Sequence, residues 1–334
     1  MSRFKLAWVA LFCLFSPIAY ARSRPLHIYF IDVEGGQATL LVTPSRQSVL
    51  IDTGWAGGRD AGRIISAAQS AGLKRIDFVV ITHYHDDHVG GVADLAARFK
   101  VGTYVDHGDN TEDSAKHNYD AYLKLVEHAE RVVVKPNEGL PLRDLKLEFL
   151  AAGGQVIKDP LPGAGEANFN CGSETAPENA TENSQSVGML VSYGKFHFLD
   201  LGDLVEKKEL ELVCPNNLIG TVDLYLTTHH GAYPDNPKAL VWALHPVVAV
   251  MNNGAHKGGN PKAWQIVHDS PGLAGFWQLH YAVDGGKDHN VAEDFIANTD
   301  EASDGHYLEV TADPDGRFQV INSRNGYRQK YGKD

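Results

Sequence analysis

Short apolar runs alternate with polar, glycine-containing stretches along most of the chain. Runs of β-branched and aromatic residues are typical of strands, whereas apolar residues spaced three or four apart indicate helices. This pattern predicts strands near 26–32, 39–43, 48–52, 78–82, 101–105, 145–150, 187–192, 195–200, 222–227 and 247–251. It predicts helices near 59–72, 91–98, 116–130, 204–213, 237–244 and 261–269. Strands interleaved with helices in this way indicate the α/β class and a single layered domain.

The first 21 residues have a different pattern. Arg3 and Lys5 precede an apolar run over residues 6–15, and the small residues Ala19 and Ala21 follow it. A charged start, a short apolar centre and a small-x-small end are typical of a cleavable signal peptide. We therefore expect a signal peptide over 1–21, a mature chain over 22–334, and a periplasmic or secreted location. The apolar run is short for a transmembrane helix, so we expect no membrane span after cleavage.

The charge of the chain limits its partners. The formal net charge is −12, and cleavage after Ala21 would remove Arg3 and Lys5 and no acidic residue, which takes it to −14. Such an acidic surface disfavours long nucleic acid but still allows a small-molecule or nucleotide-like substrate. Cys171 and Cys214 remain in the mature chain. Export permits a disulfide between them, and two buried thiols are the alternative.

The densest cluster of potential ligands lies directly after the predicted strand that ends near residue 82. His83, His85, Asp87 and His88 occur within six residues, in an H-x-H-x-D-H pattern. Imidazole and carboxylate groups are suitable ligands for zinc, manganese or iron. The spacing suggests two adjacent metal positions, with His83 and His85 at the first and Asp87 and His88 at the second. The alternatives are a polar surface loop or a single structural metal.

This motif and several others make the chain similar to the metallo-β-lactamase superfamily. The stretches 28–38 and 224–231 resemble the branch of ComEC-type competence proteins, the second in its His-His-Gly form. The stretches 49–54 and 198–203 resemble the first and fourth motifs of the superfamily. The resemblance covers about 26–285 and implies a four-layered αββα sandwich for the mature domain.

The resemblance also implies roles for residues outside the cluster. Asp52 is expected to orient a ligand histidine from behind. Asp203 is expected to join both metal positions, although it could also cap the following helix. One of His229 and His230 is expected to be the last ligand, and His229 is slightly favoured because it lies nearer the strand end.

One motif departs from the superfamily pattern. The third motif usually supplies a histidine, but the matching stretch 182–191 contains none, as in ComEC-type sequences. The second position would then be complete, with Asp87, His88, Asp203 and His229 or His230. The first would retain His83 and His85 and be completed by water, Asn183 or His107, so we expect weaker occupancy there. Two divalent ions are expected, with zinc the first choice and manganese the alternative.

Three further segments leave alternatives open. Residues 153–185 are predicted to be a loop insertion, either functional or merely flexible, and the chain past 285 a C-terminal extension. His107 could line the cleft, although a surface position is favoured. Asn252, His256 and Lys257 could contact an anionic substrate, with Lys257 offsetting charge and His256 moving protons. Alternatively, this turn only caps the next helix.

Together these features predict an exported metal-dependent hydrolase. By resemblance, a hydroxide shared by two metals would attack the substrate, and Asp87 would orient it or accept its proton. The leading substrate class is a phosphodiester, and the alternative is a lactone or β-lactam. A function of another class, a catalytically weak metal- or ligand-binding protein, is suggested by the missing third histidine.

Overall fold

Two β-sheets form the centre of the computed structural model, which describes residues 24–172 and 181–332. The signal peptide predicted over 1–21 lies outside the described residues. In the first sheet the strand order is β17-β16-β15-β1-β2-β3-β4-β5-β6. Its strands are β1 (Leu26–Phe30), β2 (Thr39–Val42), β3 (Ser48–Ile51), β4 (Ile76–Val80), β5 (Val101–Asp106), β6 (Glu130–Val133), β15 (Leu308–Ala312), β16 (Phe318–Asn322) and β17 (Arg328–Tyr331).

The second sheet faces the first and has the order β14-β13-β12-β11-β10-β9-β7-β8. Its strands are β7 (Lys146–Ala152), β8 (Gln155–Val156), β9 (Gly188–Tyr193), β10 (Phe196–Asp200), β11 (Leu224–Leu226), β12 (Val248–Met251), β13 (Gly275–His280) and β14 (Ile296–Asn298). Side chains such as Phe30, Phe149 and Trp277 fill the space between the sheets. Strands buried on both faces are rich in apolar residues, which explains the apolar run over residues 49–51 of β3.

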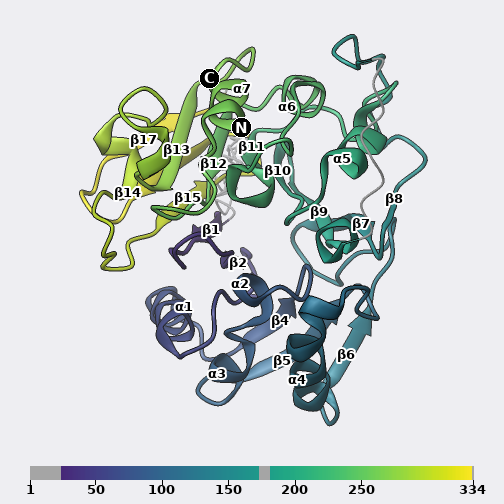
Figure 1. Ribbon diagram of the computed structural model, residues 1–334, viewed down its shortest axis with the longest axis vertical. Coiled ribbons are helices and arrows are strands. Elements are labelled where there is room, and N and C mark those ends of the chain that lie inside the picture. The colour runs from purple at the N-terminus through teal and green to yellow at the C-terminus, as the bar shows by residue number, and fades with distance from the viewer. Residues whose placement is uncertain (1–23, 173–180, 333–334) are drawn as a thin grey trace, which may run out of the picture.

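Helices cover the outer face of each sheet, so the four-layered αββα prediction is confirmed. Figure 1 shows one group of helices beside the strands of the first half of the chain and a second group at the opposite side. The first group is α1 (Arg59–Ser70), α2 (Asp86–Val89), α3 (Val92–Ala96) and α4 (Lys116–Val126), and the second is α5 (Glu206–Val213), α6 (Lys238–Leu244) and α7 (Pro261–His268). None of the described helices is both long and apolar enough to cross a membrane.

Several elements differ from the prediction. The helix predicted over 91–98 is α3, and a further short helix that was not predicted, α2, precedes it and begins inside the ligand cluster. The helix predicted over 116–130 ends at Val126, and the β-branched run that follows it forms the edge strand β6. Residues 308–331, expected only as a C-terminal extension, supply β15, β16 and β17, and β15 pairs with β1.

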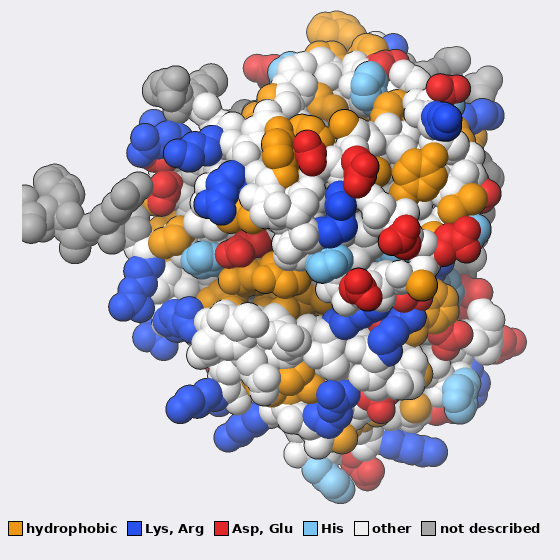
Figure 2. Space-filling model, turned by 90° about the vertical axis from the view of Figure 1, so that its left-hand side faces the viewer, with side chains coloured by type: hydrophobic (Ala, Val, Ile, Leu, Met, Phe, Trp, Pro, Cys, Tyr) orange, Lys and Arg blue, Asp and Glu red, His pale blue; other side chains and the backbone are white. Residues whose placement is uncertain are grey.

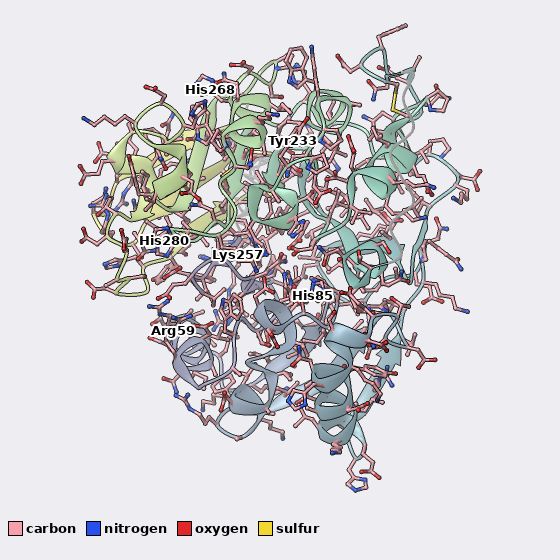
Figure 3. All side chains as sticks on the ribbon, in the orientation of Figure 1. Arg59, His85, Tyr233, Lys257, His268 and His280 are labelled. Carbon is pink, nitrogen blue, oxygen red and sulfur yellow. A yellow bond between two sulfur atoms is a disulfide. The ribbon has the colours of Figure 1, made fainter. Side chains whose placement is uncertain are left out.

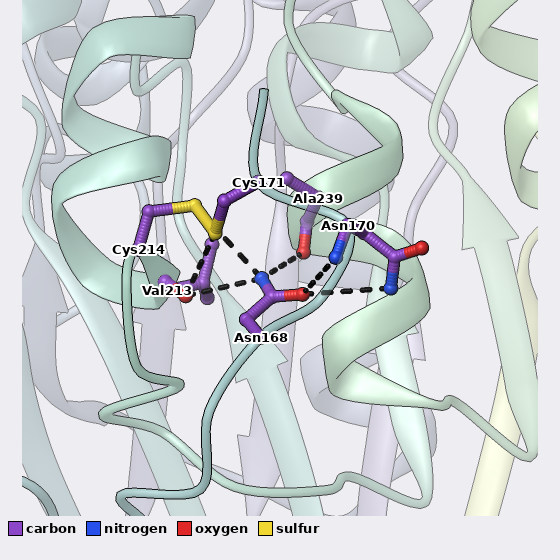
Figure 4. The surroundings of a disulfide bond; sticks show 6 residues. All are labelled: Asn168, Asn170, Cys171, Val213, Cys214 and Ala239. Atoms are coloured by element: carbon purple, nitrogen blue, oxygen red, sulfur yellow. Dashed lines mark hydrogen bonds between the residues drawn. A yellow bond between two sulfur atoms is a disulfide. The ribbon is translucent and has the colours of Figure 1, made fainter. Parts of the chain in front are cut away.

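The long loop before β9 is attached to the helices of the second sheet. Cys171 forms a disulfide with Cys214, at the end of α5, which decides between the two alternatives left open by the sequence. Asn168 Nδ2 donates to Val213 O at 3.0 Å and to Ala239 O at 2.9 Å (Figure 4). The described part of the loop is therefore fastened to α5 and α6 by both covalent and polar contacts.

Candidate metal centre

Four buried side chains converge at the carboxyl ends of strands from both sheets. Asp87, His88, Asp203 and His230 each offer one ligand atom, and these atoms all lie within 4.8 Å of one another. His230 Nε2 is 3.1 Å from Asp87 Oδ2 and 3.3 Å from Asp203 Oδ2. His88 Nε2 is 3.2 Å from Asp203 Oδ2. Two nitrogen and two oxygen donors at these separations are a suitable set for a divalent ion such as zinc.

Parallel strands explain why these residues meet. β4 runs parallel to β3, and β10 runs parallel to β11, so the loops that follow them emerge at the same end of each sheet. Asp87 and His88 lie in α2 directly after β4, Asp203 follows β10, and His230 follows β11. Ligand sites in α/β folds form at such carboxyl ends.

The charge state of the carboxylates fits a cation. Burial acts to raise the pKa of Asp87 and Asp203, but the neighbouring histidines hold both pKa values well below the usual range. Asp203 Oδ1 and His230 Nδ1 are buried and have no hydrogen-bond partner among the described residues. An ionised, partly unpartnered cluster of this kind is what a bound divalent ion would satisfy.

Asp52 lies behind the cluster. Its Oδ2 is 2.7 Å from His88 Nδ1, and it also accepts from Thr82 Oγ1 at 2.7 Å, while its Oδ1 accepts from the Thr82 backbone N–H at 2.8 Å. Because His88 binds through Nε2 at the cluster, a carboxylate at Nδ1 fixes the orientation of its ring. This is the contact expected of Asp52 from the sequence.

His83 and His85 lie beside the four-residue cluster rather than within it. The rings of His83 and His88 have centroids 4.0 Å apart, and His83 Nε2 is 3.0 Å from His85 Nδ1. His85 Nε2 faces Glu112 Oε2 at 3.4 Å. His83 and His85 therefore face each other beside the four-residue cluster. This is where the sequence predicts the first of the two metal positions.

His229 and His230 exchange the roles that the sequence favoured. His230 belongs to the cluster, whereas His229 Nε2 is 3.5 Å from Asp203 Oδ2 and 3.4 Å from Asn183 Nδ2. His229 Nδ1 is 2.6 Å from Asp235 Oδ2. Both histidines have a positive φ, 51° and 56°, so the chain turns sharply here. His230 enters the four-residue cluster, and His229 lies at its edge, near Asp203.

Asn183 and His107 were both considered for the first position. Asn183 Oδ1 is buried without a partner among the described residues, and it therefore remains available as a ligand. His107 is not on the surface as favoured from the sequence. It is buried and its Nε2 is 3.1 Å from Glu182 Oε2, which commits it to that carboxylate.

Lys257 and His256 differ although they are adjacent. Lys257 Nζ contacts Asp87 Oδ2 and lies 4.8 Å from the centroid of the Trp55 ring. The His256 side chain is 61% exposed and faces Glu301 at 3.6 Å, so the structure does not bring it to the cluster. Figure 3 shows Lys257 and His85 in the central region between the two halves of the molecule.

Sequence reasoning missed several residues that support the site. Gly36 packs so closely on the ligand loop that a Cβ there would lie 2.4 Å from Asp87 O, which explains why glycine is required. Gln37 Nε2 donates to both carboxylate oxygens of Asp200, and burial raises the pKa of Asp200 to about 7. Glu182 accepts from Thr111 and faces His107. These contacts join distant parts of the chain, so no local motif announces them.

Comparisons with known proteins agree with this geometry. The model of the metallo-β-lactamase superfamily matches residues 31–234. A hydroxyacylglutathione hydrolase of Acidiphilium cryptum (strain JF-5) is 55% identical over 113 residues, which cover 34% of this chain and 40% of that protein. ComE operon protein 3 of Bacillus subtilis (strain 168) is 24% identical over 242 residues, 67% of this chain and 28% of that protein.

The chain thus spans less than half the length of these curated relatives. Among solved structures, the metallo-β-lactamase fold protein YhfI from Bacillus subtilis is 12% identical, with a TM-score of 0.49 over 76% of this chain and 96% of that chain. The family match covers more than half of the sequence and includes the whole ligand run. The chain belongs to the metallo-β-lactamase superfamily.

Proposed function

We propose that the protein is a metal-dependent hydrolase that cleaves phosphodiester bonds. The observation that carries the proposal is the buried cluster of Asp87, His88, Asp203 and His230, with the ammonium group of Lys257 against Asp87. Two carboxylates and two imidazoles hold a divalent ion well, and a cation beside them favours an anionic substrate.

The residues of the site have separate proposed roles. The four cluster residues would hold one ion, and His83, His85 and Asn183 would contribute to a second, weaker position. Bound there, such ions supply an acidified water and stabilise negative charge on the substrate. Asp52 keeps His88 oriented through Nδ1. Lys257 Nζ is close enough to Asp87 to bind a substrate oxygen at the same place.

Two observations favour a phosphodiester. Lys257 provides a positive charge at the mouth of the site, and Asn252, which follows β12, is buried with neither side-chain polar atom bonded to a described residue. Each of these two groups can donate a hydrogen bond to a phosphate oxygen. The similarity to ComEC-type sequences, including the loss of the third histidine, also supports a phosphodiester substrate.

A second candidate is a thioester or lactone. The relative from Acidiphilium cryptum is named a hydroxyacylglutathione hydrolase and is 55% identical over the aligned third of this chain. The fold alone does not choose between an acyl and a phosphoryl centre. A substrate of this kind is therefore the specific alternative, and the β-lactams follow it.

A substrate panel tests the proposal. Protein loaded with zinc or manganese is assayed with bis-p-nitrophenyl phosphate, S-lactoylglutathione, a lactone and nitrocefin. We expect turnover of the phosphodiester. Turnover confined to the thioester or to the lactam would overturn the phosphodiesterase assignment, and tight metal retention without any turnover would favour a binding protein.

The Asp87→Ala variant tests the centre itself. It removes a ligand and should abolish hydrolysis while the circular dichroism spectrum and the melting curve remain folded in character. Asp86→Ala is the matched control, because Asp86 is exposed and bonds to Asn118 rather than to the cluster. Full activity in Asp87→Ala would contradict the mechanism.

We also infer that the protein is exported. The disulfide between Cys171 and Cys214 supports this, since disulfides persist mainly in oxidising compartments. The expected result is that intact mass analysis of the native protein from a periplasmic or culture fraction gives a chain that begins at Arg22 with Cys171 and Cys214 oxidised. Recovery of the chain with Met1 retained, in the cytoplasmic fraction, would refute export.

A further inference from the structure

A hollow opens beside the metal centre and is not used by the mechanism above. It has a volume of about 410 Å³ and is lined by Glu34, Trp55, Ala56 and Arg59. Lys257 connects it to the centre, because its Nζ contacts Asp87 and also lies over the Trp55 ring, 4.8 Å from the centroid. A ligand bound at the metal centre would therefore have an aromatic wall within reach.

The charges of the hollow are largely compensated. The guanidinium of Arg59 contacts Glu34 Oε2 through one nitrogen and donates to Asp60 Oδ1 through Nε at 2.6 Å. Asp60 Oδ2 in turn accepts from the Trp55 backbone N–H at 2.8 Å, which fixes the backbone of Trp55 in the wall of the hollow. Arg59 is thus occupied by two carboxylates, and the positive charge that faces the metal ligands is that of Lys257.

This arrangement separates two kinds of recognition. Negative charge is favoured at the metal centre and Lys257, while a neutral planar group is favoured against Trp55. A phosphate joined through a sugar to a base has both parts. Tryptophan provides a face on which any base can stack, without a demand for a particular sequence.

We propose that the hollow binds the base of a nucleoside monophosphate unit whose phosphate lies at the metal centre. The inference rests on the proposed phosphodiesterase function and names its substrate class. Figure 2 views the molecule from the side on which Figure 3 places Arg59, and acidic and basic side chains are mixed there rather than gathered into a basic track. With a net charge of −12 as well, the site suits a small nucleotide more than a long polymer.

Isothermal titration of the metal-loaded protein with AMP and with ribose 5-phosphate isolates the contribution of the base. We expect AMP to bind about tenfold more tightly, which is the order of one stacked base. In Trp55→Leu this ratio should fall to about one, because the stacking face is lost. The ratio is the readout, since the Trp55 ring also contacts Lys257 and its removal changes the phosphate contact of both ligands alike. Trp55→Phe keeps an aromatic face and should retain most of the preference.

The matched control is Trp242→Leu. Trp242 on α6 also carries a lysine over its ring, with Lys238 Nζ 3.8 Å from the centroid, but it is not part of the hollow. This variant should keep the preference for AMP. A preference that survives in Trp55→Leu, or a native protein that binds both ligands equally, overturns the base subsite.

Turnover of bis-p-nitrophenyl phosphate separates this failure from failure of the proposed function. Turnover with equal affinity for AMP and ribose 5-phosphate overturns the subsite and leaves the phosphodiesterase standing. A Trp55-dependent preference for AMP in a protein that cleaves no diester supports the nucleotide site and overturns the phosphodiesterase assignment.

Discussion

Asp32, just past the end of β1, is a fully buried carboxylate with four partners. Its Oδ1 lies 2.6 Å from His280 Nε2 and accepts from the Glu34 backbone N–H at 2.9 Å. Its Oδ2 accepts from Arg63 Nη1 at 2.8 Å and contacts the Ser303 hydroxyl. Burial acts to raise the pKa of Asp32, but the hydrogen bonds and the charge of its partners hold the pKa below its ordinary value. The charged form is therefore stabilised in the folded protein.

A depressed pKa in the folded state gives stability that is present above the unfolded-state pKa and is lost as the pH falls through the folded-state pKa. We expect Asp32→Asn to lower the free energy of unfolding by about 3 kcal/mol at pH 7, the order of breaking a buried ion pair. The difference should shrink below about pH 4, where the unfolded carboxyl is protonated. Urea unfolding of both proteins at pH 7 and pH 3 measures it. Asp315→Asn is the exposed control, and a pH-independent difference would contradict the assignment.

At the residue scale, ligands that lie close together in the sequence could be predicted, whereas contacts between residues far apart in the sequence could not. His83, His85, Asp87 and His88 are recognisable because the ligands are a few positions apart. The choice between His229 and His230 depended on two consecutive left-handed residues, which no strand pattern reveals. The burial of His107 depends on Glu182, 75 positions away, and the mixed chemistry of the Trp55 hollow depends on Lys257.

At the scale of the element, strands with continuous apolar runs were predicted to within a few residues. β3 and β12, for example, differ from the expected ranges only at their ends. β6 was missed because an edge strand needs few buried residues: Val132 and Val133 are 41% and 47% exposed. β17 is likewise largely polar, with Arg328 and Lys330 exposed, so its place in the sheet depends on pairing with β16 rather than on apolar pattern.

The loop that leads to η2 (Glu182–Gln185) shows how an element without periodicity can still be ordered. Backbone hydrogen bonds join Leu161 to Leu218 and Gly165 to Asn217, in addition to the disulfide and the Asn168 contacts. Polar and glycine-rich composition predicted a loop, but composition does not indicate where a loop will bind.

At the scale of the molecule, the metal ligands join the two sheets. Asp87 and His88 follow β4 of the first sheet, whereas Asp203 and His230 follow β10 and β11 of the second. An ion held by all four would cross-link the layers of the sandwich. It would bind the folded state and not the unfolded chain, and it would therefore raise stability by mass action.

Thermal unfolding with and without metal tests this cross-link. Zinc at 100 times its Kd should contribute about 2.7 kcal/mol relative to protein treated with EDTA. For a chain of this size the gain corresponds to a rise in Tm of about 4 °C. Asp203→Asn should lose most of the rise and Asp86→Asn should keep it. An equal rise in both variants would mean that the ion binds elsewhere.

The pairing of β15 with β1 affects how the chain folds. His27 and Glu309, whose side chains meet diagonally across this pair, are 282 positions apart. Neither the first sheet nor the Asp32 cluster, which includes Ser303, can be completed until nearly the whole chain is available. Pairings between such distant segments form slowly. If the protein is exported as proposed, late closure would leave the chain unfolded while it crosses the membrane, and the metal ligands from the two sheets would first meet after export.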